Sequence, residues 1–138
     1  MMGELTVFQI AGRAMSAQQV RLNAVASNLA NAGSITGSAG TAYRALRPVF
    51  ETEYANLTKN PGVATVNAVT VERSQAAPEK RYSPGHPLAD DQGYIYATNV
   101  DTNEEMVEMM EAARQYQNNI EVIATAKSLM LKTLSVGK

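Results

Sequence analysis

The feature that most constrains this chain is a long periodic pattern near its C-terminal end, over residues 101–136. Apolar residues there follow alternating three- and four-residue steps, which is the spacing of a coiled-coil seam along one helix, and Lys127 interrupts the row once. A helix with such a seam needs a partner that covers it. The pattern predicts a helix with an assembly seam at Met106, Met109, Ala113, Tyr116, Ile120, Ile123, Met130 and Leu134.

The start of this helix carries two matching capping signals. Asp101 with Glu104, and Thr102 with Glu105, both fit the capping-box pattern, so the register of the cap stays open. Glutamates fill the first turns and lysines the last, which complements the helix dipole at both ends.

A second seam occupies residues 2–32 and predicts a second long helix. Charges are sparse there, and the rest of its surface is Ser, Gln, Asn, Thr and Ala, which favours contact with further helices over contact with water. We expect the helix to stop at Asn31, with Gly33 in the left-handed conformation. The seam residues are Phe8, Met15, Leu22, Val25 and Leu29.

The middle of the chain has the composition of loops and short strands. Residues 33–42 are rich in Gly, Ser and Thr and are predicted to form a flexible connection. Residues 43–52 and 63–72 are predicted to be antiparallel strands around a turn at residues 59–62. The odd step from Val66 to Val69 predicts either a bulge or a strand boundary at a different residue. Residues 74–91, with three prolines, are expected to be irregular, and residues 93–97 form a third strand.

The predicted fold is therefore mainly α with a small β insert. The long N- and C-terminal helices pair as a coiled coil, and a short antiparallel β-rich region lies between them. We expect three units: an N-terminal helix in residues 1–33, a loop and β-rich insert in residues 34–100, and a C-terminal helix in residues 101–138.

Bulk properties exclude several function classes. A formal net charge of -1 gives no basic surface for DNA or RNA, so no nucleic-acid partner is expected. The chain has no cysteine, hence no disulfide and no sulfur ligand for a metal. No run reaches the roughly 20 apolar residues of a membrane span, and the first ten residues lack the pattern of a cleaved secretory signal.

No catalytic or cofactor site can be assembled from the motifs. The single histidine, His86, lies between prolines and glycine without an orienting carboxylate, and is read as a surface loop residue. Asp90 and Asp91 lack the alternating ligands of a calcium loop and are read as a turn before a strand. We therefore expect no enzyme activity, no cofactor, no metal and no small-molecule substrate.

Four stretches resemble one known family. The stretch that closes the N-terminal helix, with Ser27, Asn28, Leu29, Ala30 and Asn31, resembles the motif of bacterial flagellar basal-body rod and hook proteins. The resemblance continues in Tyr43-Arg44-Ala45, in residues 85–101 and in residues 104–137, and is nearest to the proximal rod proteins of this family. The stretch at residues 85–101 ends in the motif residues Asn99, Val100 and Asp101.

The resemblance implies a structural subunit of the flagellar basal-body rod. Such proteins are made in the cytoplasm, exported by the flagellar type III apparatus without signal cleavage, and assembled in the periplasm with copies of themselves and other rod proteins. Their terminal helices form the inner part of the rod and the insert forms an outer layer. Two alternatives stay open: another rod or hook subunit of the same superfamily, and a self-contained helical hairpin that acts as a binding module.

Overall fold

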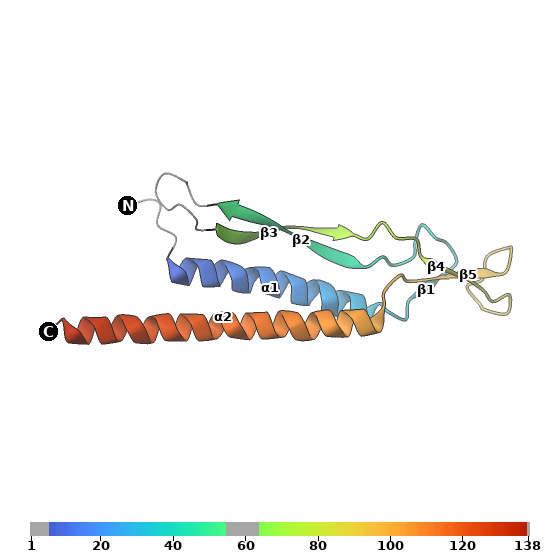
Figure 1. The fold of residues 1–138 in the computed structure, drawn as a ribbon. Coiled ribbons are helices and arrows are strands. Elements are labelled where there is room, and N and C mark those ends of the chain that lie inside the picture. Colours follow the sequence, from blue (N-terminus) through green and yellow to red (C-terminus); the bar gives the residue numbers. More distant parts are fainter. Residues whose placement is uncertain (1–5, 55–63, 138) are drawn as a thin grey trace.

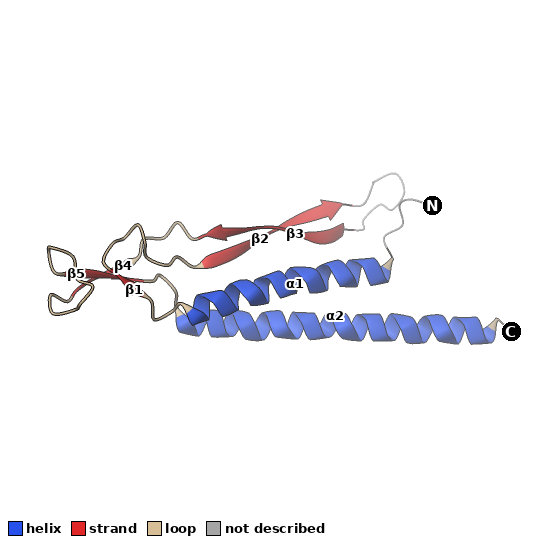
Figure 2. Cartoon of the chain, turned by 180° about the vertical axis from the view of Figure 1, so that it is seen from behind, coloured by secondary structure: helices blue, strands red, loops and turns tan. Residues whose placement is uncertain are grey.

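The molecule is elongated, with two antiparallel helices along its length and strands beside and beyond them (Figure 1). The computed structural model describes residues 6–54 and 64–137. Helix α1 (Val7–Ala30) lies between helix α2 (Thr102–Val136) and a hairpin of strands β2 (Leu46–Tyr54) and β3 (Ala64–Arg73), as both views show (Figure 1 and Figure 2). The predicted fold, mainly helical with a β region that lies between the two helices in the sequence, is confirmed. The coiled-coil geometry of their pairing stays a prediction.

Helix α1 begins at a capping box that the sequence reading did not use. The Thr6 backbone N–H donates to Gln9 Oε1 at 3.0 Å, and the Gln9 backbone N–H donates to Thr6 Oγ1 at 3.2 Å. These two bonds satisfy backbone donors that the first turn of a helix leaves without partners.

Helix α1 ends without the left-handed glycine that we expected. Asn31 is the C-cap, and its Nδ2 donates to the Ser27 carbonyl oxygen at 2.8 Å. Gly93 is the one described residue with a positive φ, of 82°, so the conformation predicted for Gly33 is wrong. The asparagine side chain closes the last turn instead.

Helix α2 begins at the first of its two candidate caps. Asp101 Oδ1 accepts hydrogen bonds from the backbone N–H groups of Asn103 at 2.8 Å and Glu104 at 3.2 Å. The cap at Asp101 fixes the register that the sequence left open.

Strands β2 and β3 pair antiparallel, as predicted, with one irregularity. Val49 lies opposite Thr70 and Phe50 lies opposite Ala68, so Val69 is an extra residue in β3. The bulge predicted from the odd valine spacing is therefore confirmed. The turn predicted at residues 59–62 lies outside the described residues.

A second sheet, separate from the hairpin, contains three short strands. Strand β5 (Tyr94–Ala97) lies in its middle and pairs antiparallel with β1 (Ile35–Thr36) and β4 (Glu79–Tyr82). The strand predicted at residues 93–97 is confirmed, but the flanking segments at 33–42 and 74–91 were predicted as loops and each contributes a strand. Because β1 has two residues and β4 is exposed throughout, neither carries the alternation that would identify it.

Small residues dominate the core around α1. Its buried residues include Ala11, Ala17 and Ala24, and Ala112 of α2 is fully buried. Side chains of this size let helix backbones approach closely. The largest fully buried side chains are polar instead, namely Asn28 and Glu105.

Replacing Ala112 with Leu should lower the free energy of unfolding by about 1–3 kcal/mol, because a larger side chain overpacks the contact between the helices. The matched control is Ala113→Leu, at the next and exposed position, which should change stability by less than about 0.5 kcal/mol. Chemical denaturation of the purified chain, followed by far-UV circular dichroism, measures both. Equal effects would contradict this packing.

Candidate functional site

A buried polar cluster, here called the polar junction, joins the end of α1, the start of α2 and the first residues of β2. It consists of Asn28, Glu105, Arg47, Tyr43 and the backbone of Leu46. These residues are far apart in sequence, with 77 positions between Asn28 and Glu105. The polar junction is therefore a product of the tertiary fold.

Asn28 uses every donor and acceptor of its side-chain amide. Its Nδ2 donates to the Leu46 carbonyl oxygen and to Glu105 Oε2, both at 3.0 Å. Its Oδ1 accepts from the Leu46 backbone N–H at 2.7 Å and from the Tyr43 hydroxyl at 3.0 Å. An amide has two donors and two acceptor sites, so this fully buried residue is completely satisfied.

Glu105 is a fully buried carboxylate at the start of α2. Its Oε1 accepts from Arg47 Nη1 at 2.5 Å, and its Oε2 accepts from Asn28. Burying a carboxylate is costly unless it is paired and hydrogen-bonded, and here both oxygens have partners. The Arg47 side chain is 39% exposed, so solvent screens part of this charge pair.

A second ion pair joins the two helices further along. Arg21 of α1 bonds Glu108 of α2 through two guanidinium nitrogens, with Nε at 2.8 Å from Oε2. Glu111 lies 3.8 Å from the same guanidinium. Together with the polar junction, this pair aligns the two helices through charged and hydrogen-bonded groups.

The residues of the family motif surround the polar junction. Ser27 Oγ lies 3.0 Å from the Tyr43 hydroxyl, and Asn99 accepts from the Ala45 backbone N–H at 2.8 Å and donates to the Ala76 carbonyl oxygen at 3.1 Å. Leu29 and Val100 are half-buried and Ala30 is exposed, while the two remaining motif residues cap the helices, Asn31 at the end of α1 and Asp101 at the start of α2.

The predicted seam residues of α1 are all at least half-buried. Val25 is buried, and the other four are half-buried, namely Phe8, Met15, Leu22 and Leu29. The surface of α1 away from α2 is covered by β2 and β3. Helix α1 therefore carries few charges because strands cover its other side. We had expected further helices to cover it.

On α2 the predicted seam divides into two rows. Met109, Tyr116 and Ile123 are half-buried. The other predicted row, with Met106, Ala113 and Ile120, is exposed. The row that is buried or half-buried lies one residue earlier, at Glu105, Ala112, Asn119 and Ala126. The exposed predicted residues are Met106, Ala113, Ile120, Met130 and Leu134, and their role in assembly stays a prediction.

Sequence reasoning missed Glu105, Arg47, Arg21 and Glu108 as interaction residues. Glu105 was read only as a candidate capping-box partner of Thr102 and as a charge that complements the helix dipole. A signal was present, because Glu105 lies four residues before Met109 and seven before Ala112, and therefore on the same side of the helix. Its partners could not be found from that spacing.

The predicted absence of a metal site and the surroundings of His86 can be compared with the described residues. Within residues 6–54 and 64–137 no group of three or more His, Asp or Glu side chains is arranged to hold a metal ion. His86 Nδ1 accepts from the Leu88 backbone N–H at 3.1 Å within its loop. Neither of the two described helices combines the length and the hydropathy needed to cross a membrane.

Comparisons with known protein families agree on flagellar basal-body rod proteins. A model of the flagella basal body rod protein matches residues 8–33, and a model of the C-terminal part of flagellar basal body rod FlgEFG proteins matches residues 91–136. These ranges contain Asn28 and Glu105.

Full-length relatives extend this similarity to the whole chain. The chain is 51% identical over 139 residues to the flagellar basal-body rod protein FlgC of Salmonella typhimurium. The identity is 50% over 139 residues to FlgC of Escherichia coli O157:H7 and 46% over 138 residues to FlgC of Yersinia enterocolitica. Each alignment covers 99% of this chain and 100% of the relative.

Replacing Asn28 with Ala should lower the free energy of unfolding by about 3 kcal/mol or more, because several buried groups lose a partner and each costs about 1–3 kcal/mol. Denaturant titration of the purified chain measures the loss. Asn23→Ala, an exposed asparagine on the same helix, is the control and should stay within about 0.5 kcal/mol of the unchanged protein. Similar losses in both variants would refute the role of the polar junction.

Replacing Arg47 with Met keeps an aliphatic side chain but leaves the Glu105 carboxylate without its cation. We expect a loss of about 3 kcal/mol, the lower end for a broken buried pair, because Arg47 is partly exposed. Arg81→Met is the matched control, since its partner Glu79 is exposed and such pairs contribute less than about 1 kcal/mol. The same denaturation assay applies, and an Arg47 variant as stable as the control would contradict the assignment.

Proposed function

The chain belongs to the FlgC family of flagellar basal-body rod proteins and is a structural subunit of the proximal rod, and we propose that α2 joins it to neighbouring subunits. The joining surface consists of apolar side chains that the single chain leaves exposed. The relatives are named as rod proteins, and the role proposed for this chain is structural and non-enzymatic.

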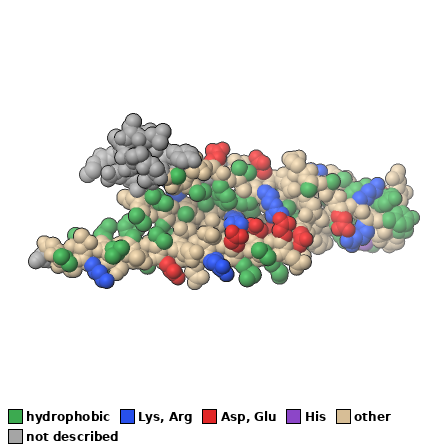
Figure 3. Space-filling view, viewed as in Figure 1, with side chains coloured by type: hydrophobic (Ala, Val, Ile, Leu, Met, Phe, Trp, Pro, Cys, Tyr) green, Lys and Arg blue, Asp and Glu red, His purple; other side chains and the backbone are tan. Residues whose placement is uncertain are grey.

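The observation that carries this proposal is the exposed apolar surface of α2. Met106, Ile120 and Leu134 are all exposed, and Ile120, the least exposed of the three, is 45% exposed. The last turns of α2 extend past the first residue of α1 (Figure 1), and hydrophobic side chains lie on the visible face of this end (Figure 3). So many large apolar side chains exposed along one helix favour a protein–protein contact there.

The subunits assemble head-to-tail with copies of themselves and with other flagellar rod proteins. A repeated contact whose rotation does not close a ring generates a helical assembly, which is the form that a rod requires. The elongated shape of the molecule supports contacts between successive ends. In this arrangement residues 1–33 and 101–138 form the core of the rod, and residues 34–100 form its outer part.

The subunit reaches the rod by export. We propose synthesis in the cytoplasm, passage through the flagellar type III apparatus without signal cleavage, and assembly in the periplasm. Family membership supports this route. The chain also has no cysteine, so no disulfide has to form or break during passage.

Replacing Ile120 with Glu tests the assembly surface. Because Ile120 is exposed, the purified variant should keep its free energy of unfolding within about 0.5 kcal/mol. In the rod, a charge buried without a partner is costly, so cells carrying the variant should lose assembled rods and swimming.

The control for Ile120→Glu is Asn118→Glu, which places the same charge at an exposed polar position of α2. This variant should assemble and support swimming. Electron microscopy of isolated basal bodies and motility in soft agar are the readouts. Normal rods with Ile120→Glu would refute the proposed surface.

A further inference from the structure

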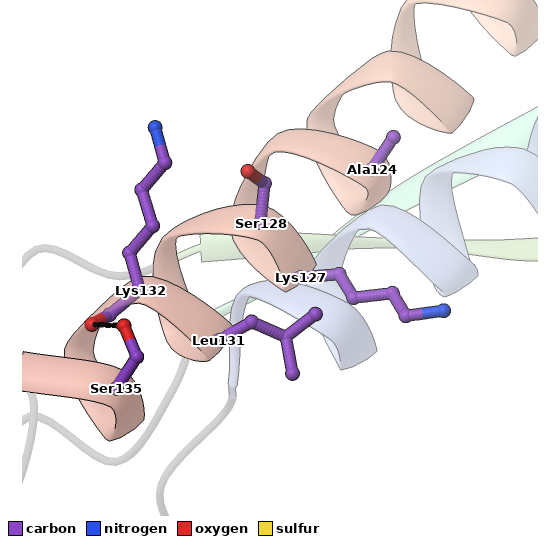
Figure 4. A pocket seen from close by; sticks show the side chains of 6 residues that line it. All are labelled: Ala124, Lys127, Ser128, Leu131, Lys132 and Ser135. Carbon is purple, nitrogen blue, oxygen red and sulfur yellow. Dashed lines mark hydrogen bonds between the residues drawn. The ribbon is translucent and has the colours of Figure 1, made fainter. Parts of the chain in front are cut away.

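A shallow groove, wide open to solvent and formed by α2 alone, lies near the C-terminal end of this helix. It has a volume of about 450 Å³. Leu131 lies between Lys127 and Lys132, whose side chains extend in different directions, and small side chains leave the space open (Figure 4). The small lining residues are Ala124, Ser128 and Ser135.

The charges of the two lysines are not neutralised by any residue that the structure describes. No described residue forms an ion pair with Lys127 or Lys132, and residues 127–137 are exposed throughout. The groove is therefore apolar in the middle with positive charge on both sides. A complementary partner is apolar in the middle with negative charge on both sides.

The first turns of α2 carry this complementary pattern. Val107 is 63% exposed, and Glu104 and Glu111 lie three residues before it and four after it, on the same side of the helix. Both carboxylates are mostly exposed, at 62% and 54%.

Both carboxylates also keep capacity for another cation. Glu104 contacts Arg47 at 3.5 Å and Glu111 contacts Arg21 at 3.8 Å, and each arginine has a shorter contact with another glutamate. A carboxylate can accept about four hydrogen bonds.

We infer that the groove at the end of α2 binds the first turns of α2 in a second copy of this chain. Leu131 packs against Val107 of the second copy, and Lys127 and Lys132 pair with its Glu104 and Glu111. In the head-to-tail assembly proposed above, successive copies point the same way, so the two helices run parallel. The offset between the copies is then about 36 Å, at about 1.5 Å per residue.

This contact deepens the proposed function, on which it rests, by assigning a partner surface to the end of α2. It joins two different surfaces of the same molecule, so it is heterologous and leaves both ends free to add further copies. Charge complementarity suppresses wrong registers and fixes the offset.

Disulfide crosslinking tests the contact, because the chain has no cysteine of its own. Val107→Cys and Leu131→Cys change exposed residues. Equal amounts of the two purified variants are mixed and oxidised, and mass spectrometry identifies the products. We expect the mixed dimer to exceed either homodimer by about tenfold, and the double variant Val107→Cys/Leu131→Cys to form a ladder of multimers. Statistical mixing, a dominant homodimer, or a closed dimer of the double variant would overturn the inference.

Charge reversal distinguishes this contact from general apolar association. Lys127→Glu/Lys132→Glu in the Leu131→Cys chain should reduce the mixed dimer by about tenfold. Glu104→Lys/Glu111→Lys in the Val107→Cys chain should restore it. Arg73→Glu/Arg81→Glu in the Leu131→Cys chain makes the same change in net charge at exposed positions and should leave the yield unchanged. Equal yields in all mixtures would contradict the charge pairing.

Cells separate the failure of this contact from the failure of the proposed function. We expect the Lys127→Glu/Lys132→Glu variant to lose assembled rods. If that strain swims normally and Ile120→Glu still abolishes rods, the inference is overturned and the proposed function stands. Normal rods with Ile120→Glu refute the proposed surface whatever the crosslinking result.

Discussion

The hydrogen bond between Asn28 and Glu105 is the contact on which the arrangement of the two helices depends. Both side chains are fully buried, and Asn28 also binds both backbone groups of Leu46, where β2 begins. A displacement of α1 by one turn along α2 would leave a buried amide and a buried carboxylate without partners, which is far costlier than losing an exposed bond. The buried apolar residues of the two helices are alanines and Val25, and such small side chains specify register weakly. Polar groups therefore define the relative position of the helices, and small apolar groups let them lie close together.

This register also determines how far α2 extends beyond α1. The length that protrudes follows from the helix lengths and from the point at which the polar junction holds them, and one turn of displacement would change it by about 5.4 Å. The surface that we assign to contacts between subunits lies partly on this protruding end. A buried interaction inside one subunit thus sets the spacing of contacts outside it.

Sequence periodicity was sufficient for the helices, the hairpin and its bulge, but only partly for the contact surface. Met109, Tyr116 and Ile123 are half-buried, as a seam requires, whereas the second buried row lies one residue earlier than predicted. The prediction chose Met106 and Ile120 for that row because they are more apolar than Glu105 and Asn119, which are the residues that the fold covers. Burial of a carboxylate depends on Arg47 and Asn28, which lie 58 and 77 positions away, and no local pattern contains that information. The short strands β1 and β4 were missed for the same reason, since their formation depends on pairing with β5.

The position of α1 as a middle layer has a mechanical consequence for a subunit of a rotating shaft. Helix α1 contacts α2 on one side and the hairpin of β2 and β3 on the other. A force between the hairpin and α2 is therefore transmitted through α1 and acts as shear at both of these contacts. Alanine contacts resist sliding weakly because they present no deep interlocking side chains, whereas the hydrogen bonds of Asn28 and the ion pairs of Arg47 and Arg21 are directional. All of these bonds lie toward the end where α1 stops and α2 starts. Under torque these directional bonds hold the three layers to one another at that end.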